Sequence, residues 1–138
     1  MGMKAEYRSA KRSRNLIRQA YTELLKEKDL NKITVTDIVN RADINRGTFY
    51  AHYPDVRGVT EEIENEFIDK MLNILSKFKY NKFFKNPTPL LLETSRFLEK
   101  DEKFYKILIQ SNNSEIFLEK LKKYFLIMCF LIPIYRMI

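Results

Sequence analysis

One stretch of the chain, ITVTDIVNRADINRGTFYAHYP, constrains the fold more than any other. Near its start, Thr34 is followed three residues later by Asp37, which is the spacing of a helix capping box with a shorter acidic arm. Apolar residues at helical spacing follow and end at Ala42. The sequence therefore predicts a short helix over about residues 35–42.

A tight turn and a second short helix come next in the same stretch. Asp43 tolerates the left-handed backbone that tight turns require, and Asn45 has a side chain that caps helix N-termini. Pro54 disfavours helical backbone at the residue before it, so it ends the helix. We therefore expect a helix over about residues 46–53, joined to the first by a short turn.

A longer amphipathic helix precedes this pair. Between residues 8 and 28, apolar side chains recur at the spacing of one helix face. A long helix followed by two short helices across a tight turn forms a helix-turn-helix. Composition agrees, because 3 glycines and 4 prolines in 138 residues are too few for a turn-rich β protein. We expect an all-α fold.

The second short helix carries side chains that suit neither a plain core nor a plain solvent face. Phe49 and Tyr53 lie four residues apart and are expected to face the core together. The positions on or near the other face are Arg46, Gly47, Thr48, Tyr50 and His52. Arginine pairs with a guanine edge or a phosphate, glycine admits close backbone approach, and hydroxyl and imidazole groups hold phosphate oxygens. This predicts a DNA-reading helix. The alternative is an ordinary packed helix, with Tyr50 half-buried and His52 a surface histidine.

Positive charge gathers at the front of the chain. The net charge is +7, and the first 18 residues hold six basic side chains against one acidic side chain. A basic segment beside a reading helix favours a polyanionic partner, because each neutralised phosphate releases condensed counterions. A solvated helix face is the other interpretation of the same charges.

The run ITVTDIVNRADINRGTFYAHYPD, and above all its string RGTFYAHY, resembles the N-terminal DNA-binding domain of the TetR/AcrR family of transcriptional regulators. The resemblance covers about residues 10–60. It implies a homodimeric regulator, usually a repressor, that places its third helix in the major groove of a palindromic operator. The predicted DNA-binding residues are Thr34, Thr36, Asn45, Arg46, Gly47, Thr48, Tyr50, His52 and Arg57.

Two positions depart from the family pattern. The usual glycine of the turn is Asp43, and the usual lysine at the start of the fourth helix is Val56. Either the neighbouring Arg57 makes the phosphate contact of that lysine, or this contact is lost.

The rest of the chain is expected to form a second helical domain. We predict a DNA-binding domain over residues 1–54 and a shortened ligand and dimerisation domain over residues 55–138. The predicted helices run from Asp55 to about residue 79, over about 90–100, over 103–110 and from 114 onward. By the resemblance, a small-molecule effector would bind between them, with Phe83, Phe84, Phe97, Phe104 and Tyr105 as candidate pocket residues. Ordinary core packing is the alternative for each of these aromatics.

The C-terminal segment YFLIMCFLIPIYRMI is apolar on all sides of any helix that it forms. Its 12 uncharged residues between Lys123 and Arg136 fall short of the roughly 20 that cross a bilayer. We expect this segment either to be buried in a dimer interface or to be the cut or altered end of a longer chain. We predict a homodimer built on the last predicted helix, from residue 114 onward, and on this segment.

A single histidine and a single cysteine limit the chemistry of the chain. They exclude a disulfide framework and a zinc site built within one chain, and there is no glycine-rich phosphate loop. We therefore expect no enzyme activity, no metal and no cofactor. Without a signal-peptide core, the expected location is the cytoplasm, away from membranes. The alternatives to an effector-responsive repressor are an accessory DNA-binding regulator without an effector and a membrane-surface module that uses the basic helix and apolar tail.

Overall fold

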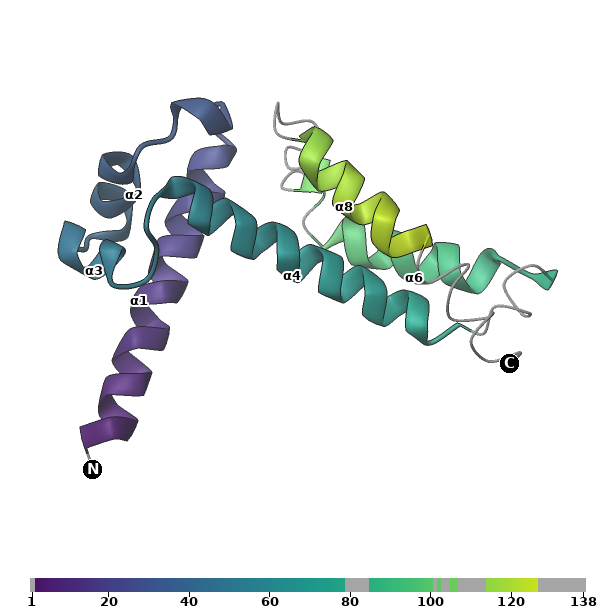
Figure 1. The fold of residues 1–138 in the computed structure, drawn as a ribbon, viewed down its shortest axis with the longest axis horizontal. Coiled ribbons are helices and arrows are strands. Elements are labelled where there is room, and N and C mark those ends of the chain that lie inside the picture. The colour runs from purple at the N-terminus through teal and green to yellow at the C-terminus, as the bar shows by residue number, and fades with distance from the viewer. Residues whose placement is uncertain (1, 79–84, 101, 103–104, 107–113, 127–138) are drawn as a thin grey trace. The chain divides into compact units, whose positions relative to one another are not determined.

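The computed structural model describes residues 2–78, 85–100, 102, 105–106 and 114–126. The regular elements in these residues are all helices, which confirms the predicted all-α class (Figure 1). Contacts divide the chain into two compact units, Met1–Ile63 and Glu64–Ile138, called unit 1 and unit 2 below.

Unit 1 begins with α1 (Gly2–Leu25), which starts earlier and ends earlier than the predicted helix. Its buried face consists of Ile17, Ala20, Tyr21, Leu24 and Leu25. After α1 the chain turns, because the N–H groups of Glu27 and Lys28 both bond to the Leu24 carbonyl. The short 3₁₀ helix η1 (Leu30–Lys32) then leads into the next helix.

The second helix, α2 (Val35–Ala42), has the predicted bounds. Thr34 and Asp37 form the predicted capping box, in which each side chain accepts a hydrogen bond from the other residue's backbone N–H. Asp43 ends the helix with φ 53° and ψ 51°, which is the left-handed conformation expected of the turn.

The third helix, α3 (Arg46–Tyr50), is shorter than the predicted helix over residues 46–53. The residues after Tyr50 form a turn, because the N–H groups of His52 and Tyr53 both donate to the Phe49 carbonyl. The prediction for its inner face is confirmed, because Phe49 is 0% exposed and Tyr53 is 4% exposed.

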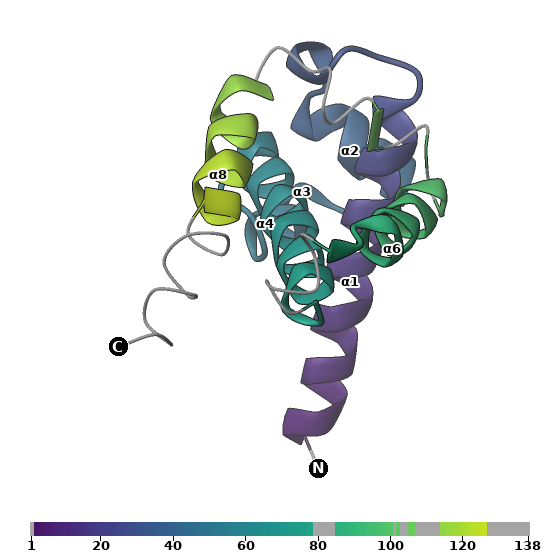
Figure 2. The ribbon, with the colours of Figure 1, turned by 90° about the vertical axis from the view of Figure 1, so that its right-hand side faces the viewer.

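The N-terminal half of α1 extends past α2 and α3, as both ribbon views show (Figures 1 and 2). Its described side chains over residues 3–12 are exposed. Only the C-terminal half of α1 therefore belongs to the core of unit 1.

The helix α4 (Val56–Ser76) starts in unit 1 and ends in unit 2. The Asp55 side chain accepts a hydrogen bond from the Gly58 N–H at 2.9 Å, as expected of a capping residue. Val59 and Ile63 are buried in the first turns, and Phe67 is buried farther along.

In unit 2, α4 is followed by α6 (Thr88–Glu99) and α8 (Ser114–Leu126). They correspond to the helices predicted over about residues 90–100 and from 114. The helix predicted over residues 103–110 lies mostly outside the described residues, as does most of the apolar C-terminal segment.

Phe67 of α4 lies at the centre of an aromatic cluster in unit 2. The centroid of its ring is 5.6 Å from that of Phe97 on α6 and 5.4 Å from that of Phe117 on α8. Tyr105 joins the cluster at 5.2 Å from Phe67. Aromatic packing therefore joins the described helices of unit 2.

Candidate nucleic-acid interface

The N-terminus of α3 is held by Asn45. Its side-chain Oδ1 accepts hydrogen bonds from the Thr48 N–H at 2.7 Å and from the Thr48 hydroxyl at 3.0 Å. The Thr48 hydroxyl hydrogen is therefore occupied, and its oxygen is left to accept from a base amino group. Asn45, one of the predicted DNA-binding residues, caps the helix with its oxygen and has its NH₂ group left for a ligand.

Arg46 and Thr36 come together from α3 and α2. The guanidinium Nη2 of Arg46 donates to the Thr36 hydroxyl oxygen at 2.6 Å, and both residues are exposed. Because Thr36 accepts this bond, its own hydroxyl hydrogen is available for a phosphate oxygen. The contact also limits the rotamers of Arg46, which keeps further N–H donors for a base edge or phosphate.

Thr34 differs from Thr36 although both were predicted to contact DNA. Its hydroxyl accepts from the Asp37 N–H at 3.2 Å and donates to Asp37 Oδ2 at 2.9 Å. Phosphate oxygens only accept hydrogen bonds, so Thr34 would have to break its bond to Asp37 to donate to one.

Gly47 and Tyr50 lie on the exposed side of α3. A Cβ atom at Gly47 would lie 3.3 Å from the Asn45 Oδ1 atom, so a side chain there would crowd the cap. Tyr50 is 51% exposed, and its ring packs edge-on against Phe49 at 5.4 Å between centroids. The ring therefore contacts the core residue Phe49 while much of the side chain stays open to solvent or to a ligand.

The two other predicted DNA contacts lie beyond α3. His52 is half-buried, and its ring centroid is 6.3 Å from that of Tyr53. Arg57 is exposed on the first turn of α4, where its Nε donates to Glu61 Oε1 at 2.8 Å. A phosphate contact by Arg57 has to compete with this carboxylate.

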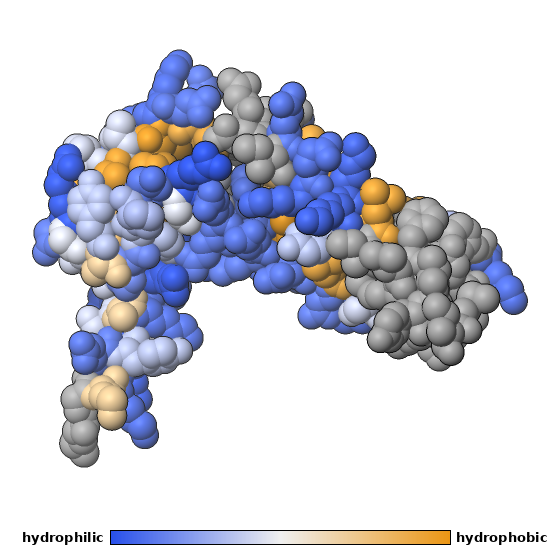
Figure 3. Space-filling model, viewed as in Figure 1, coloured by the Kyte–Doolittle hydropathy of each residue, from blue (hydrophilic) through white to orange (hydrophobic). Residues whose placement is uncertain are grey.

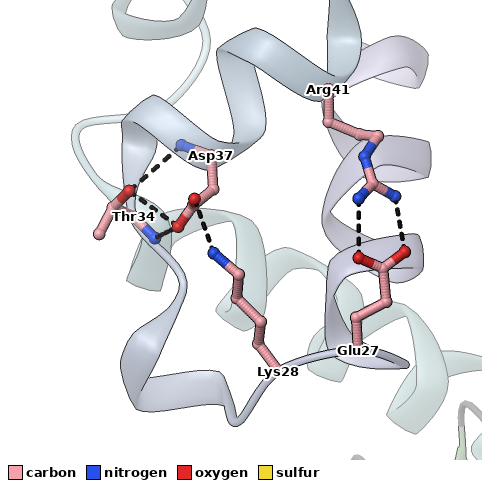
Figure 4. A network of polar contacts seen from close by, with 5 residues as sticks. All are labelled: Glu27, Lys28, Thr34, Asp37 and Arg41. Carbon is pink, nitrogen blue, oxygen red and sulfur yellow. Dashed lines mark hydrogen bonds and ion pairs between the residues drawn. The ribbon is translucent and has the colours of Figure 1, made fainter.

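A network of charged side chains joins α2 to the segment that directly follows α1 (Figure 4). Lys28 Nζ lies 2.7 Å from Asp37 Oδ1, on the same carboxylate that completes the capping box. Arg41 binds Glu27 through both terminal nitrogens, at 2.9 and 2.8 Å. The network thus joins the segment that follows α1 to both ends of α2.

The electrostatics of this network follow from its short contacts. The Lys28 ammonium and the hydrogen bonds from Thr34 lower the pKa of Asp37 from 3.8 to about 2. The hydrogen bonds with Arg41 lower the pKa of Glu27, and that carboxylate raises the pKa of Arg41. Asp37, Glu27 and Arg41 therefore stay charged at neutral pH.

Three further contacts join α4 to the rest of unit 1. The Tyr53 hydroxyl donates to Glu62 Oε2, and Arg14 Nε lies 3.2 Å from Glu62 Oε1. The hydroxyl oxygens of Tyr21 and Thr60 are 2.6 Å apart in the core, so they share a hydrogen bond.

The charged partners Lys28, Glu27, Glu62 and Arg14 were not predicted from the sequence. The sequence shows their charges, but it has no local spacing that pairs residues 9 to 48 positions apart. Only the turn after α1 and the start of α4 bring them together.

The predicted effector residues are placed only in part. Phe83, Phe84 and Phe104 lie outside the described residues. Phe97 and Tyr105 pack against each other at 5.1 Å between ring centroids. These two rings therefore contribute to the aromatic cluster of unit 2.

Residues 17–63 match the family model described as bacterial regulatory proteins, tetR family. The matched segment ends at the last residue of unit 1 and contains α2, α3 and the capping residues. No curated protein and no solved structure gives a significant match to the chain. In the part of the chain that the structure describes, no helix is long and apolar enough to span a membrane.

Proposed function

Since residues 17–63 form the N-terminal helix-turn-helix domain of a TetR family DNA-binding transcriptional regulator, we propose that the chain is a repressor that reads a palindromic operator as a homodimer. The observation that carries the proposal is the two-sided character of α3. Phe49 is fully buried on one side, whereas Arg46 and Tyr50 are exposed on the other. A helix of this kind can enter the major groove without losing its core contacts.

The described contacts support a division of roles among the site residues. Arg46 reads a base edge or a phosphate, Gly47 allows close approach, and Thr48 accepts from a base amino group. The phosphate contacts come from side chains with a hydrogen left to donate. Thr36, Tyr50 and His52 are such donors, as is the Asn45 amide at the N-terminus of α3, whereas Arg57 would reach a phosphate in competition with Glu61.

The homodimer is supported by exposed apolar side chains in unit 2. They are Leu91 and Leu92 on α6 and Leu118, Tyr124 and Leu126 on α8. On the face drawn in Figure 3, apolar atoms of unit 2 reach the surface among polar ones. Burial against a second copy would remove these side chains from water and pair two reading helices, as a palindrome requires.

Selection of bound duplexes from a random DNA pool tests the proposal. The purified protein is incubated with the pool at low and at near-physiological salt. The mass of the free protein in solution is measured by light scattering. We expect a palindromic motif that survives the higher salt and a particle of twice the chain mass. A pool that stays random, with binding lost at the higher salt, would leave only electrostatic attachment.

A regulator without an effector is the second candidate, and the aromatic cluster favours it. Phe97 and Tyr105 pack on Phe67 and on each other, so these two candidate pocket residues already have partners. An effector would have to bind the DNA-competent and incompetent forms with different affinities. A small-molecule screen against the protein and its selected operator separates the two candidates, because a compound that releases the operator supports an effector-responsive repressor.

A further inference from the structure

Glu62 lies where α1, α4 and the turn after α3 meet in unit 1. It is on the second turn of α4, its Oε2 accepts the Tyr53 hydroxyl, and its Oε1 lies 3.2 Å from Arg14 Nε on α1. The Arg14 guanidinium in turn lies 5.7 Å from the centre of the Tyr53 ring, within the range of a cation–π contact. The three side chains therefore contact one another in pairs.

We propose that Glu62 is a positioning residue for DNA reading. Through Tyr53 and Arg14 it holds the C-terminal end of residues 46–53, called the α3 segment below. Glu62 itself is not assigned any contact with DNA. This inference rests on the proposed function, since it specifies how the reading helix keeps its orientation.

The shortness of α3 is the first reason for a positioning role. The helix has five residues, so its own hydrogen bonds fix little more than one turn. Its N-terminal end is fixed by Asn45 and by the contact between Arg46 and Thr36. At the other end, the Tyr53 N–H bonds to the Phe49 carbonyl, and its side chain provides the bond to α4.

The environment of the contact is the second reason. Tyr53 is 4% exposed and the Glu62 side chain is 23% exposed, so water competes weakly for the hydroxyl. Burial and the hydrogen bond to Glu62 raise the pKa of Tyr53 to about 12. The hydroxyl therefore keeps its proton and remains a donor at neutral pH.

The contact between Tyr21 and Thr60 provides a matched control. It also joins a tyrosine hydroxyl to the first turns of α4, at 2.6 Å, but the tyrosine belongs to α1. Tyr21→Phe and Tyr53→Phe each remove one oxygen atom from a buried ring. Only Tyr53→Phe releases the α3 segment.

The experiment compares these two variants at a temperature at which circular dichroism shows both to be folded. For Tyr53→Phe, we expect binding to the selected operator to weaken about threefold to tenfold relative to a scrambled duplex, because fewer molecules hold α3 in the binding orientation. Tyr21→Phe should keep the wild-type ratio. Equal ratios in the two variants and the wild type, or equal losses in both variants, would overturn the positioning role.

Glu62 is tested by a pair of substitutions of its own. Glu62→Ala removes the acceptor, whereas the amide oxygen of Glu62→Gln can still accept the Tyr53 hydroxyl. We expect Glu62→Ala to lose the operator preference to the same degree as Tyr53→Phe and Glu62→Gln to restore most of it. If Glu62→Gln is no better than Glu62→Ala, the hydrogen bond does not position the helix.

Hydrogen exchange separates this inference from the proposed function, because it needs no DNA. In Tyr53→Phe, the amides of His52 and Tyr53, which bond to the Phe49 carbonyl, should exchange at least about threefold faster than in Tyr21→Phe. If Tyr53→Phe exchanges faster but the wild type selects no DNA motif, only the proposed function is contradicted. If the wild type selects a motif but exchange in Tyr53→Phe is unchanged, only the positioning role is contradicted.

Discussion

In unit 1, directional polar contacts join helices that are distant in the sequence, whereas the described helices of unit 2 meet through aromatic rings. Lys28, in the segment that follows α1, pairs with Asp37 of α2, and the Tyr53 hydroxyl connects the α3 segment to Glu62. In unit 2, Phe67 contacts Phe97 and Phe117 from two other helices. Hydrogen bonds and ion pairs fix orientation, while apolar packing tolerates more rearrangement at similar stability. A reading helix needs the first kind of contact, because base edges must be met at set distances.

The largest expected effect compares the two cores. Phe49→Ala should lower the free energy of unfolding by about 3–5 kcal/mol, because it removes a fully buried ring from unit 1. Phe97→Ala should cost about half as much, because that ring is only partly buried and its neighbours can repack. Urea unfolding followed by far-UV circular dichroism measures both. If Phe97→Ala cost as much as Phe49→Ala, the packing of unit 2 would be as strictly specified as that of unit 1.

The next effect concerns the exposed face of unit 1. Arg46→Ala should weaken binding to the selected operator by about 1–3 kcal/mol and relax the preference at one base pair. Thr36→Val should weaken operator binding by less, up to about 1 kcal/mol. It removes the hydroxyl that accepts from Arg46 and one phosphate donor, while the arginine remains.

Lys77→Ala is the matched charge control for Arg46→Ala. It also removes one exposed positive charge, but from a residue of unit 2 that directly follows α4. Titrations of the operator and of a scrambled duplex at one salt concentration compare the variants. An Arg46→Ala protein with unchanged preference would show that Arg46 only places the helix on the backbone.

Local spacing explains which parts of unit 1 the sequence could predict. Thr34 and Asp37 lie three residues apart, and Asp43 follows the last apolar residue of its helix, so both ends of α2 were predicted correctly. The end of α3 was placed too late, at residue 53 instead of Tyr50. Pro54 shows that the helix stops, but not that the residues before it form a turn around the Phe49 carbonyl.

The polar contacts of the candidate interface were less accessible to sequence reasoning. The exposed side of α3 followed from helical spacing, and the structure places Arg46, Gly47 and Tyr50 there. By contrast, the hydroxyl hydrogen of Thr34 belongs to the capping box, which separates this residue from Thr36. That distinction depends on hydrogen-bond direction, which residue types alone do not determine.

The pH dependence of unit 1 tests its charged network. The pKa of Asp37 is lowered to about 2, so its contribution to stability is present above its ordinary value of 3.8 and is lost as pH falls toward 2. We expect the thermal midpoint of the wild type to fall between about pH 4 and pH 2, and Asp37→Asn to flatten that fall. Glu119→Gln should keep the wild-type profile, because its partner Lys122 lies on the same helix. An unchanged profile in Asp37→Asn would show that the network contributes nothing measurable.

The smallest expected effect is a gain in stability at the turn between α2 and α3. Asp43 has φ 53°, a conformation that costs an aspartate more than a glycine. Its side chain is exposed, and the turn is closed by backbone bonds to the Asn40 and Val39 carbonyls, which a glycine keeps. Asp43→Gly should therefore raise the free energy of unfolding by up to about 1 kcal/mol, less the added entropy of the unfolded chain. A shift of the urea midpoint to higher concentration at unchanged slope would confirm this, whereas a loss of stability would mean that the aspartate contributes to the turn through its side chain.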